Sequence, residues 1–335
     1  MKNQYVGDIG DYGKYSLLRA FLNAGVRVGV NWYLTDDDGS TDGKFKNYLN
    51  KEAFRDYDPF VFDSLKQIID SDNITVDAVQ NSDILPRASF FAERLSSEGK
   101  PQERASKRKD WFYNSTIALC DSELVFLDPD NGLLVKDDPS TKGTEKYALP
   151  SEVRTYWNDN HNVVYYCHRG RRTDEQWQEY MRVMRKTMPG TRIIVLTYHK
   201  GTQRSYVFLV RKMHYDKYRK ILDKVIDNWK GVFTDERIEH DDAAAPIYDR
   251  DFVIYNERNI KLSGSIKDGC LHLESYVYGD AYDSEKYYDL TREDTRKLFS
   301  LMTCDEFIRH CREEKIMWME HFFEENGIKY RSYCW

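Results

Sequence analysis

The stretch LVFLDPDNG (residues 124–132) runs four apolar residues directly into an acidic turn that ends in glycine. A short apolar run bounded by turn residues is typical of a buried parallel strand. In open α/β sheets, ligands lie outside the carboxyl ends of the strands, which makes Asp128, Asp130 and Asn131 candidate site residues. Carboxylates and amides at the end of a buried strand are costly unless they are used. The alternative is an ordinary strand followed by a turn, since turns favour the same residue types.

A second candidate segment follows the strand predicted for residues 26–34. It contains Asp36, Asp38 and Asp42 among glycines. A doubly wound sheet binds its nucleoside or metal ion at this position, and several aspartates close together also suit a hard cation. We therefore predict that this loop lines the site, with a solvated surface loop as the alternative.

A third segment ends the strand predicted for residues 162–167. It begins with His168 and continues with Arg169, Arg171 and Arg172. A lone histidine is more often a structural hydrogen-bonding residue, but this one lies at the edge where a ligand is expected. The three arginines would bind phosphate. Because the carboxyl ends of parallel strands share one sheet edge, we expect His168 and the aspartates of the first two segments to line one pocket.

The N-terminal segment, residues 4–15, interleaves three glycines with Tyr5, Asp8, Asp11 and Lys14. Glycine lets the backbone approach a ligand closely, and backbone amides that lead into a helix favour anions. We expect this segment to cover the site as a lid and to precede a helix. Loss of Lys14 would then weaken ligand binding and leave the melting temperature nearly unchanged. The alternative is a flexible arm.

Two apolar runs, residues 192–199 and 205–211, are separated by a short polar loop and predict a β-hairpin. A mostly parallel sheet that finishes in a hairpin is typical of Rossmann-like methyltransferases. We therefore predict a Rossmann-like α/β domain over residues 1–232 and a small α+β accessory domain over residues 247–335. Residues 74–79 are predicted as a short strand.

Charge is distributed unevenly along the chain. The net charge is −6, which argues against a generally basic nucleic-acid binder but allows a local basic patch. From residue 233 onward there are 23 acidic and 14 basic residues, against 33 and 36 before it. This asymmetry indicates two modules, of which the acidic C-terminal one is expected to bind a protein partner. The basic run from Arg104 to Lys109 is read as a solvated face, with phosphate contact as the alternative.

The cysteines and the N-terminus bear on the location of the protein. Six cysteines are scattered without a CxxC pair, which indicates neither a zinc site nor a disulfide framework. The first residues lack the apolar core of a signal peptide, and no apolar run approaches the length of a membrane span. We therefore expect a cytoplasmic protein that does not enter a membrane.

The stretches YVGDIGDYGKYSLLRA, WYLTDDDGSTDG and VFLDPDNG together resemble a widespread family of bacterial proteins without an assigned activity. More distantly, the order of parts is similar to that of the Rossmann-like methyltransferases that modify adenine N6 in large-subunit ribosomal RNA. This resemblance implies that Lys14 belongs to an N-terminal motif and that residues 36–43 form the loop for S-adenosylmethionine. The residues from Asp128 to Asn131 stand where that family has DPPY, with Asp130 at the second proline and Asn131 at the aromatic position.

Our first hypothesis is a methyltransferase-type enzyme that acts on nucleic acid or nucleotide with S-adenosylmethionine as cofactor. Asp128 would accept a hydrogen bond from the exocyclic amine of the target, and Asn131 would orient it. The catalytic candidates are Asp128, Asp130, Asn131, His168 and Lys14; the cofactor candidates are Tyr5, Asp8, Asp11, Asp36, Asp38 and Asp42; the substrate candidates are Arg169, Arg171 and Arg172.

Two other classes of function remain open. In a nuclease or phosphohydrolase that depends on Mg²⁺ or Mn²⁺, the metal ligands would be Asp36, Asp38, Asp128 and Asp130. In a non-enzymatic sensor or scaffold, a degenerate Rossmann-like site would hold a nucleotide ligand. The motivation for the third class is that the sequence lacks a GxGxG turn and a nucleophile triad.

Overall fold

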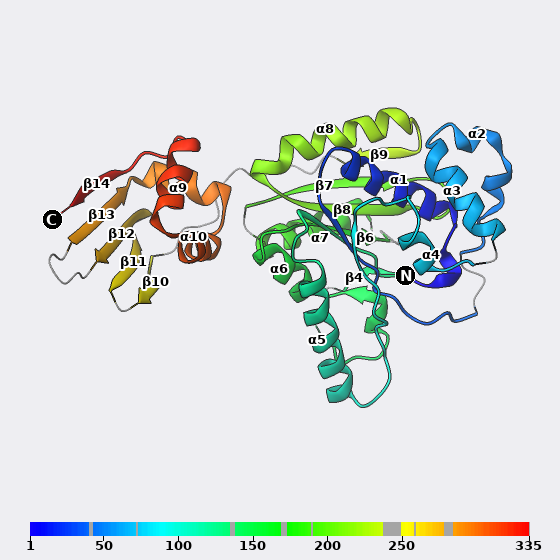
Figure 1. Cartoon of the computed structure of the whole chain (residues 1–335), viewed down its shortest axis with the longest axis horizontal. Coiled ribbons are helices and arrows are strands. Elements are labelled where there is room, and N and C mark those ends of the chain that lie inside the picture. The colour runs from blue at the N-terminus through cyan, green and yellow to red at the C-terminus, as the bar shows by residue number, and fades with distance from the viewer. Residues whose placement is uncertain are drawn as a thin grey trace. The chain divides into compact units, whose positions relative to one another are not determined.

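The computed structural model describes residues 1–39, 43–71, 73–134, 138–168, 173–188, 190–236, 249–257, 259–277 and 284–334. These residues divide into two compact units (Figure 1). The second unit contains the residues from 249 onward together with two short pieces, 190–191 and Arg211–Met213, and the first unit contains the rest.

The first unit contains one large sheet with helices on both sides. Its helices and strands are, in chain order, α1 (Ile9–Asn23), β1 (Val28–Asn31), α2 (Glu52–Arg55), α3 (Pro59–Asp70), α4 (Val76–Gln80), β2 (Ser89–Phe91), α5 (Pro101–Ala118), β3 (Leu124–Leu127), β4 (Gly132–Leu133), β5 (Tyr147–Ala148), α6 (Pro150–Asn158), β6 (Asn162–Cys167), α7 (Asp174–Thr187), β7 (Thr191–Tyr198), β8 (Arg204–Arg211), α8 (Lys212–Asn228) and β9 (Phe233–Glu236). Short 3₁₀ helices span Asn3–Tyr5, Asn47–Asn50 and Thr144–Lys146.

The large sheet has seven strands in the order β2-β1-β3-β6-β8-β7-β9. Strands β2, β1, β3 and β6 are parallel to one another. Strand β8 runs antiparallel to β6, and β9 runs antiparallel to β7. Strands β7 and β8 lie side by side and are joined by residues 199–203, where the hairpin was predicted. The predicted mixed α/β class with a mostly parallel sheet is therefore confirmed.

The central strand β3 is buried on both faces. Leu124 and Phe126 pack in the core that includes residues of α1, α3 and α8, whereas Val125 and Leu127 pack in the core that includes residues of α5, α6 and α7. This alternation follows from the pleat of a strand, in which successive side chains point to opposite faces. Both faces of the sheet are thus filled with apolar side chains, and the polar residues are left to the strand ends.

Helix α1 begins earlier than the sequence predicts. Asp8 caps it by accepting a hydrogen bond of 2.8 Å from the backbone N–H of Gly10. Residues 9–15 of the predicted glycine-rich lid are therefore the first half of a buried helix. A Cβ on Gly10 would lie 2.3 Å from Cζ of Arg204, and a Cβ on Gly13 would lie 2.5 Å from the ring of Tyr198. The glycines let the helix approach side chains of the protein itself, because no Cβ keeps them apart.

The strand predicted for residues 74–79 is wrong, since α4 occupies most of this segment. Thr75 caps the helix by accepting a hydrogen bond from the N–H of Ala78. Val76 and Val79, three residues apart, lie on one face of the helix and are both buried. A short apolar run fits the helical and the strand period equally well, and here the cap decides.

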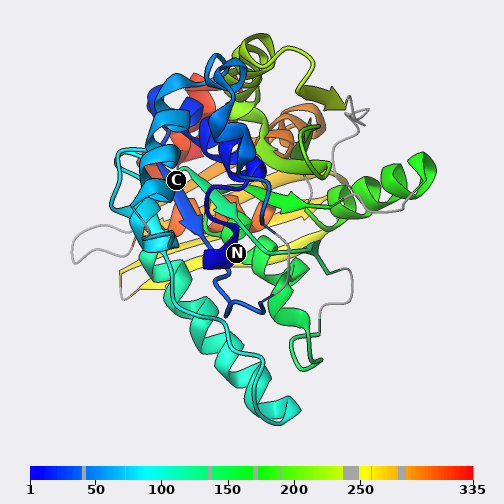
Figure 2. The same ribbon diagram turned by 90° about the vertical axis from the view of Figure 1, so that its right-hand side faces the viewer.

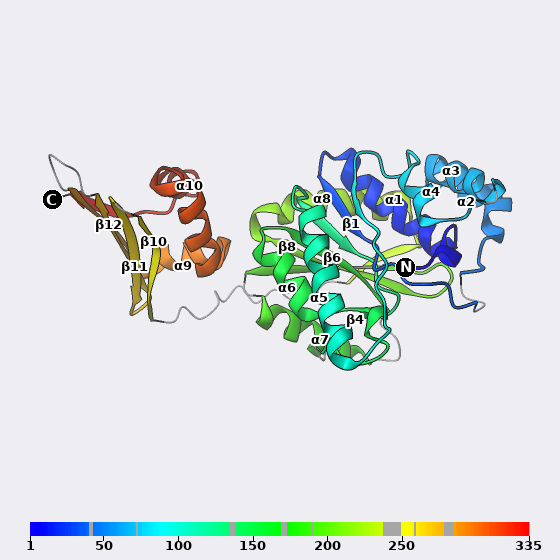
Figure 3. The same ribbon diagram turned by 60° about the horizontal axis from the view of Figure 1, so that its bottom comes forward.

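The second unit is a five-stranded antiparallel sheet with two helices. Its elements are β10 (Arg250–Glu257), β11 (Ile260–Lys267), β12 (Cys270–Val277), β13 (Ser284–Leu290), α9 (Arg292–Leu301), α10 (Cys304–Glu325) and β14 (Arg331–Cys334), and the strands follow one another in the sheet in chain order. Figure 3 shows both helices on the same face of the sheet. There Leu298 and Phe307 join the core formed by Leu262, Leu273 and Tyr288.

Candidate functional site at the carboxyl ends of β3 and β6

Three segments far apart in the sequence meet at one edge of the large sheet. Strand β3 delivers Asp128, the neighbouring parallel strand β6 delivers His168, and α1 carries Asp11 and Lys14. Figure 2 shows the N-terminus next to the large sheet. There the amino group of Met1 donates a hydrogen bond of 2.9 Å to the backbone oxygen of Asp128, so the N-terminal residues lie beside the end of β3. The edge predicted to carry the site is therefore where most of the predicted polar residues gather.

Lys14 lies at the centre of a buried ion cluster. Its Nζ is 2.8 Å from Oδ1 of Asp11 and 2.7 Å from Oδ2 of Asp128, and Tyr15 donates a hydrogen bond to Asp11. Burial lowers the pKa of Lys14, but the two carboxylates outweigh burial and hold this pKa above its ordinary value. Burial raises the pKa of Asp128 against the opposing effect of Lys14. The cluster is shielded from water, since Lys14, Asp11 and Asp128 are each only 4% exposed.

Asp130 differs from Asp128 in its partners. Its carboxylate is 6% exposed, and neither oxygen accepts a hydrogen bond of good geometry from any described donor. Two cations stand nearby, the amino group of Met1 at 2.8 Å from Oδ1 and Nζ of Lys2 at 3.7 Å from Oδ2. A buried carboxylate without hydrogen bonds is uncommon in proteins and calls for an explanation. Asp130 is therefore the acceptor in this site with capacity for a ligand. The adjacent Asn131 is exposed.

The loop after β1 reaches the site only in part. Asp38 is 2.5 Å from Nζ of Lys2, which also faces Asp130, so it lies at the accessible side of the cluster. Asp36 pairs instead with Arg94 at 2.8 Å, and its side chain is 89% exposed. Asp42 lies outside the described residues. The loop therefore contributes one of its predicted aspartates to the site.

The two remaining N-terminal candidates have different surroundings. Asp8 is buried and pairs with Nη2 of Arg204 at 2.8 Å while it caps α1. Tyr5 is half-buried, and Nζ of Lys2 lies over its ring at 5.4 Å. Burial, followed by the charge of Asp130, raises the pKa of the Tyr5 hydroxyl. Tyr5 thus lies with Asp38 at the accessible side, next to the buried carboxylate of Asp130, whereas Asp8 belongs to the buried side.

His168 lies at the end of β6 with its Nε2 2.7 Å from the hydroxyl of Tyr166. Burial, together with the positive charge of Arg204, lowers the pKa of His168. The imidazole therefore stays neutral at neutral pH and shares a hydrogen bond with the tyrosine hydroxyl. Arg169, Arg171 and Arg172, predicted to bind phosphate, lie outside the described residues.

This lowered pKa predicts a loss of stability in mild acid. The unfolded chain takes up a proton at His168 near its ordinary pKa of roughly 6.5, above the pH at which the folded chain does so. Stability is therefore lost as the pH falls below that value. Between about pH 7.5 and about pH 5.5, we expect urea denaturation to show a larger loss for the wild type than for His168→Gln. Equal losses in the two proteins would contradict the assignment.

Sequence reasoning missed two residues of the site, Arg204 and Tyr206. Arg204 pairs with Asp8, and the hydroxyl of Tyr206 is buried without a described hydrogen-bond partner. Both lie at the beginning of β8. Because β8 is antiparallel to β6, its amino end lies at the same sheet edge as the carboxyl end of β6. The predicted hairpin already implied that the amino end of its second strand lies at this edge. The prediction of site residues considered only the carboxyl ends of strands, and Arg204 and Tyr206 were therefore missed.

Each of the four aspartates proposed as metal ligands faces a cation of the chain, and Asp38 and Asp130 share Lys2. Asp36 faces Arg94, Asp38 faces Lys2 and Asp128 faces Lys14. In the part of the chain that the structure describes, no group of three or more His, Cys, Asp or Glu side chains is placed to hold a metal ion. The metal site stays a prediction from the sequence.

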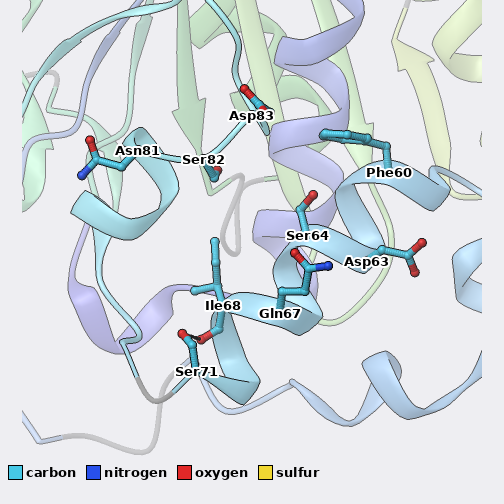
Figure 4. Close-up of a pocket in the computed structure, with 9 residues that line it drawn as sticks. All are labelled: Phe60, Asp63, Ser64, Gln67, Ile68, Ser71, Asn81, Ser82 and Asp83. Atoms are coloured by element: carbon cyan, nitrogen blue, oxygen red, sulfur yellow. Dashed lines mark hydrogen bonds between the residues drawn. The ribbon is translucent and has the colours of Figure 1, made fainter.

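A groove of about 580 Å³ lies away from these residues, between α3 and the chain after α4 (Figure 4). Its lining is polar apart from Phe60 and Ile68, and it includes Gln67, Asn81 and Asp83. None of the predicted site residues lines it. The side chains that line it include no histidine, cysteine, lysine or arginine, and its titratable groups are the carboxylates of Asp63 and Asp83.

Comparison with known proteins adds no relative. No family model matches the chain, and the search of curated proteins finds no match. Among the described helices, none has both the length and the apolar character needed to span a membrane.

Proposed function

We propose that the first unit is a Rossmann-like, methyltransferase-type enzyme that acts on nucleic acid or nucleotide. The observation that carries the proposal is the 2.7 Å contact between Lys14 and Asp128. It joins the two motifs that the resemblance to the adenine-N6 methyltransferases aligns, at the sheet edge where such enzymes bind their ligands. The antiparallel strand β8 between β6 and β7 supports the proposal, because it ends the parallel sheet with a hairpin.

The two aspartates of the DPDNG turn have different roles in this proposal. Asp128 is buried and bound by Lys14, so it positions α1 against the end of β3. Asp130 has acceptor capacity and lies beside the exposed Asn131. We therefore assign the target amine, which the sequence suggested for Asp128, to Asn131, whose amide oxygen can accept its hydrogen bond and orient it, and we leave Asp130 to the cofactor. A neutral amine held near a methyl donor needs no strongly basic residue.

The accessible side of the site fits S-adenosylmethionine in its chemistry. This cofactor presents an ammonium group and ribose hydroxyls, which are hydrogen-bond donors, and Asp130 is an acceptor without a hydrogen bond. Asp130 and Asp38 would hold these groups, with Tyr5 beside them. When bound, the cofactor supplies an electrophilic methyl group. Asp8 and Asp11 do not take part, because their oxygens already accept hydrogen bonds within the protein, Asp8 from the backbone of α1 and Asp11 from Tyr15.

Cofactor binding tests the proposal most directly. We expect isothermal titration to show S-adenosylmethionine binding, weakened about tenfold or more in Asp130→Asn, because hydrogen bonds to charged groups are worth about 1.5–3 kcal/mol. The matched control is Asp121→Asn, an exposed aspartate at the amino end of β3, which should bind as the wild type does. No heat at millimolar cofactor would contradict the proposal. Mg²⁺-dependent cleavage of nucleic acid that is lost in Asp130→Asn would favour the metal-dependent hydrolase instead.

One observation favours a sensor or scaffold as the second candidate. The salt bridges of Lys14 with Asp11 and Asp128 form a buried, charge-balanced cluster, which is typical of residues with a structural role. A ligand bound at Asp130 without transfer of a methyl group to any nucleic acid would support this candidate. In either case we propose a cytoplasmic location, since all six cysteines are free thiols.

A further inference from the structure

The sheet of the second unit has one face that no described helix of this unit covers. Helices α9 and α10 pack on the opposite face (Figure 3). Residues directly opposite each other on neighbouring strands point to the same face, and the pairings of β12, β13 and β14 therefore define the uncovered one. Its central residues, here called the tyrosine face, are His272, Glu274, Tyr276, Glu285, Tyr287, Asp289 and Tyr333.

The aromatic rings of the tyrosine face form one continuous cluster around Tyr287. Its ring stacks on Tyr333 with the centroids 5.1 Å apart and on His272 with the centroids 5.9 Å apart. Tyr276 meets it edge-on at 6.4 Å. Tyr333, on the edge strand β14, is 43% exposed. Clustered and partly exposed aromatic rings are enriched where proteins bind partners.

On the tyrosine face the hydroxyl donors are directed to carboxylates, and these carboxylates keep lone pairs for further donors. Tyr287 donates its hydroxyl to Glu285 at 2.6 Å, and Tyr333 donates to Asp289 at 3.1 Å. His272 lies between Asp289 and Glu274, in contact with both. Glu274 and Asp289 still have side chains about 40% exposed, 38% and 42%. Each carboxylate is held in place by a ring while part of it faces solvent, ready to accept further hydrogen bonds.

We propose that the tyrosine face binds a protein segment rich in arginine and lysine. Guanidinium and ammonium groups have only donors, which complements a surface that offers carboxylates and phenol oxygens. They also bind over aromatic rings, as Lys261 does within the chain, with its Nζ 5.8 Å from the centre of the Tyr276 ring. Charge complementarity thus selects a basic partner, and the stacked rings fix where its side chains lie.

The same chemistry disfavours a nucleic acid on this face. Stacked aromatic rings on an open sheet do suit the bases of a single strand. Phosphates, however, need donors and positive charge, and the donors of the three tyrosines are directed to carboxylates. The basic residues on this side surround the acidic centre: Lys261 and Lys267 lie on β11, and Arg331 lies on the edge strand β14 opposite Asp289. The proposal therefore commits to a basic protein segment.

The test uses the full chain and a fluorescent peptide of alternating arginine and glycine as the probe, with fluorescence anisotropy as the readout. We expect binding that the double variant Glu274→Gln with Glu285→Gln weakens about tenfold or more, since each lost charge removes an attraction to a partly desolvated cation. The matched control carries the same change of charge on α10, Glu324→Gln with Glu325→Gln, both exposed. The control should bind as the wild type does. Tyr287→Leu, which removes the central ring, should weaken binding as well.

Two outcomes would overturn the proposal. One is equal weakening in the two double variants, which would show attraction to overall charge and not to the tyrosine face. The other is absence of peptide binding together with binding of single-stranded DNA that Tyr287→Leu abolishes, which would assign the face to nucleic acid. Circular dichroism checks that each variant is folded. Should Tyr287→Leu fail to fold, the double variant Glu274→Gln with Glu285→Gln still tests the proposal, because each glutamine keeps the size of the side chain and one acceptor oxygen.

Discussion

Replacement of Lys14 by alanine should lower the free energy of unfolding of the first unit by about 3–5 kcal/mol, because it leaves buried charges without their partner. Asp11 and Asp128 would remain at the end of β3 with no other lysine or arginine contact among the described residues. Their repulsion would add to the cost of burial. The expected effect is therefore one of the largest that a single substitution produces in this chain.

Chemical denaturation measures this effect, with near-ultraviolet circular dichroism following the tryptophans that lie mostly in the first unit. The matched control is Lys44→Ala, an exposed lysine, which should stay within about 0.5 kcal/mol of the wild type. A loss below about 1 kcal/mol for Lys14→Ala would show that the charges are matched in another way. In that case ligand binding by the variant should be measured, because the sequence alone predicts weaker ligand binding with a nearly unchanged melting temperature.

The lid predicted for residues 4–15 differs from the helix that occupies residues 9–15, and the difference has a physical cause. Glycine is a poor helix former, so a segment with Gly7, Gly10 and Gly13 reads as an irregular arm. Positions three residues apart nevertheless share one face of a helix. In this protein Arg204 and Tyr198 fill the space beside two of the glycines. These partners come from strands far along the chain, and no local pattern identifies them.

The sheet was easier to predict than the site. Strands β3 and β6 are continuous apolar runs, and a run of this kind reports burial on both faces without reference to any partner. The choice between Asp128 and Asp130 is different in nature. The two aspartates are only two residues apart in the sequence, but Lys14 of α1 forms a salt bridge with Asp128 and not with Asp130. Sequence therefore located the edge of the sheet that carries polar residues, but it did not assign their roles.

The basic run from Arg104 to Lys109, in α5, is a second case in which the sequence did not assign the roles of individual residues. It was read as a solvated face or a phosphate contact, and Lys107 is indeed exposed. Arg108 is 3% exposed within α5, where it forms a salt bridge with Glu152 at 2.7 Å and donates to the backbone oxygens of Thr144 and Tyr147. Glu152 also accepts from the hydroxyl of Tyr33. Arg108 therefore ties α5 to α6 and to the loop before it.

Replacement of Arg108 by alanine should consequently cost about 3–5 kcal/mol of stability, since it leaves the carboxylate of Glu152 buried without its cation. Arg108→Lys should recover only part of the loss, because an ammonium cannot reproduce the flat, forked set of donors that reaches a carboxylate and two carbonyl oxygens at once. Lys107→Ala, one residue away and exposed, should change stability by no more than about 0.5 kcal/mol. Urea denaturation of the three variants gives the comparison. Equal effects of Arg108→Ala and Lys107→Ala would mean that the helix tolerates loss of the buried pair, and the assignment of Arg108 to the structural core would then be wrong.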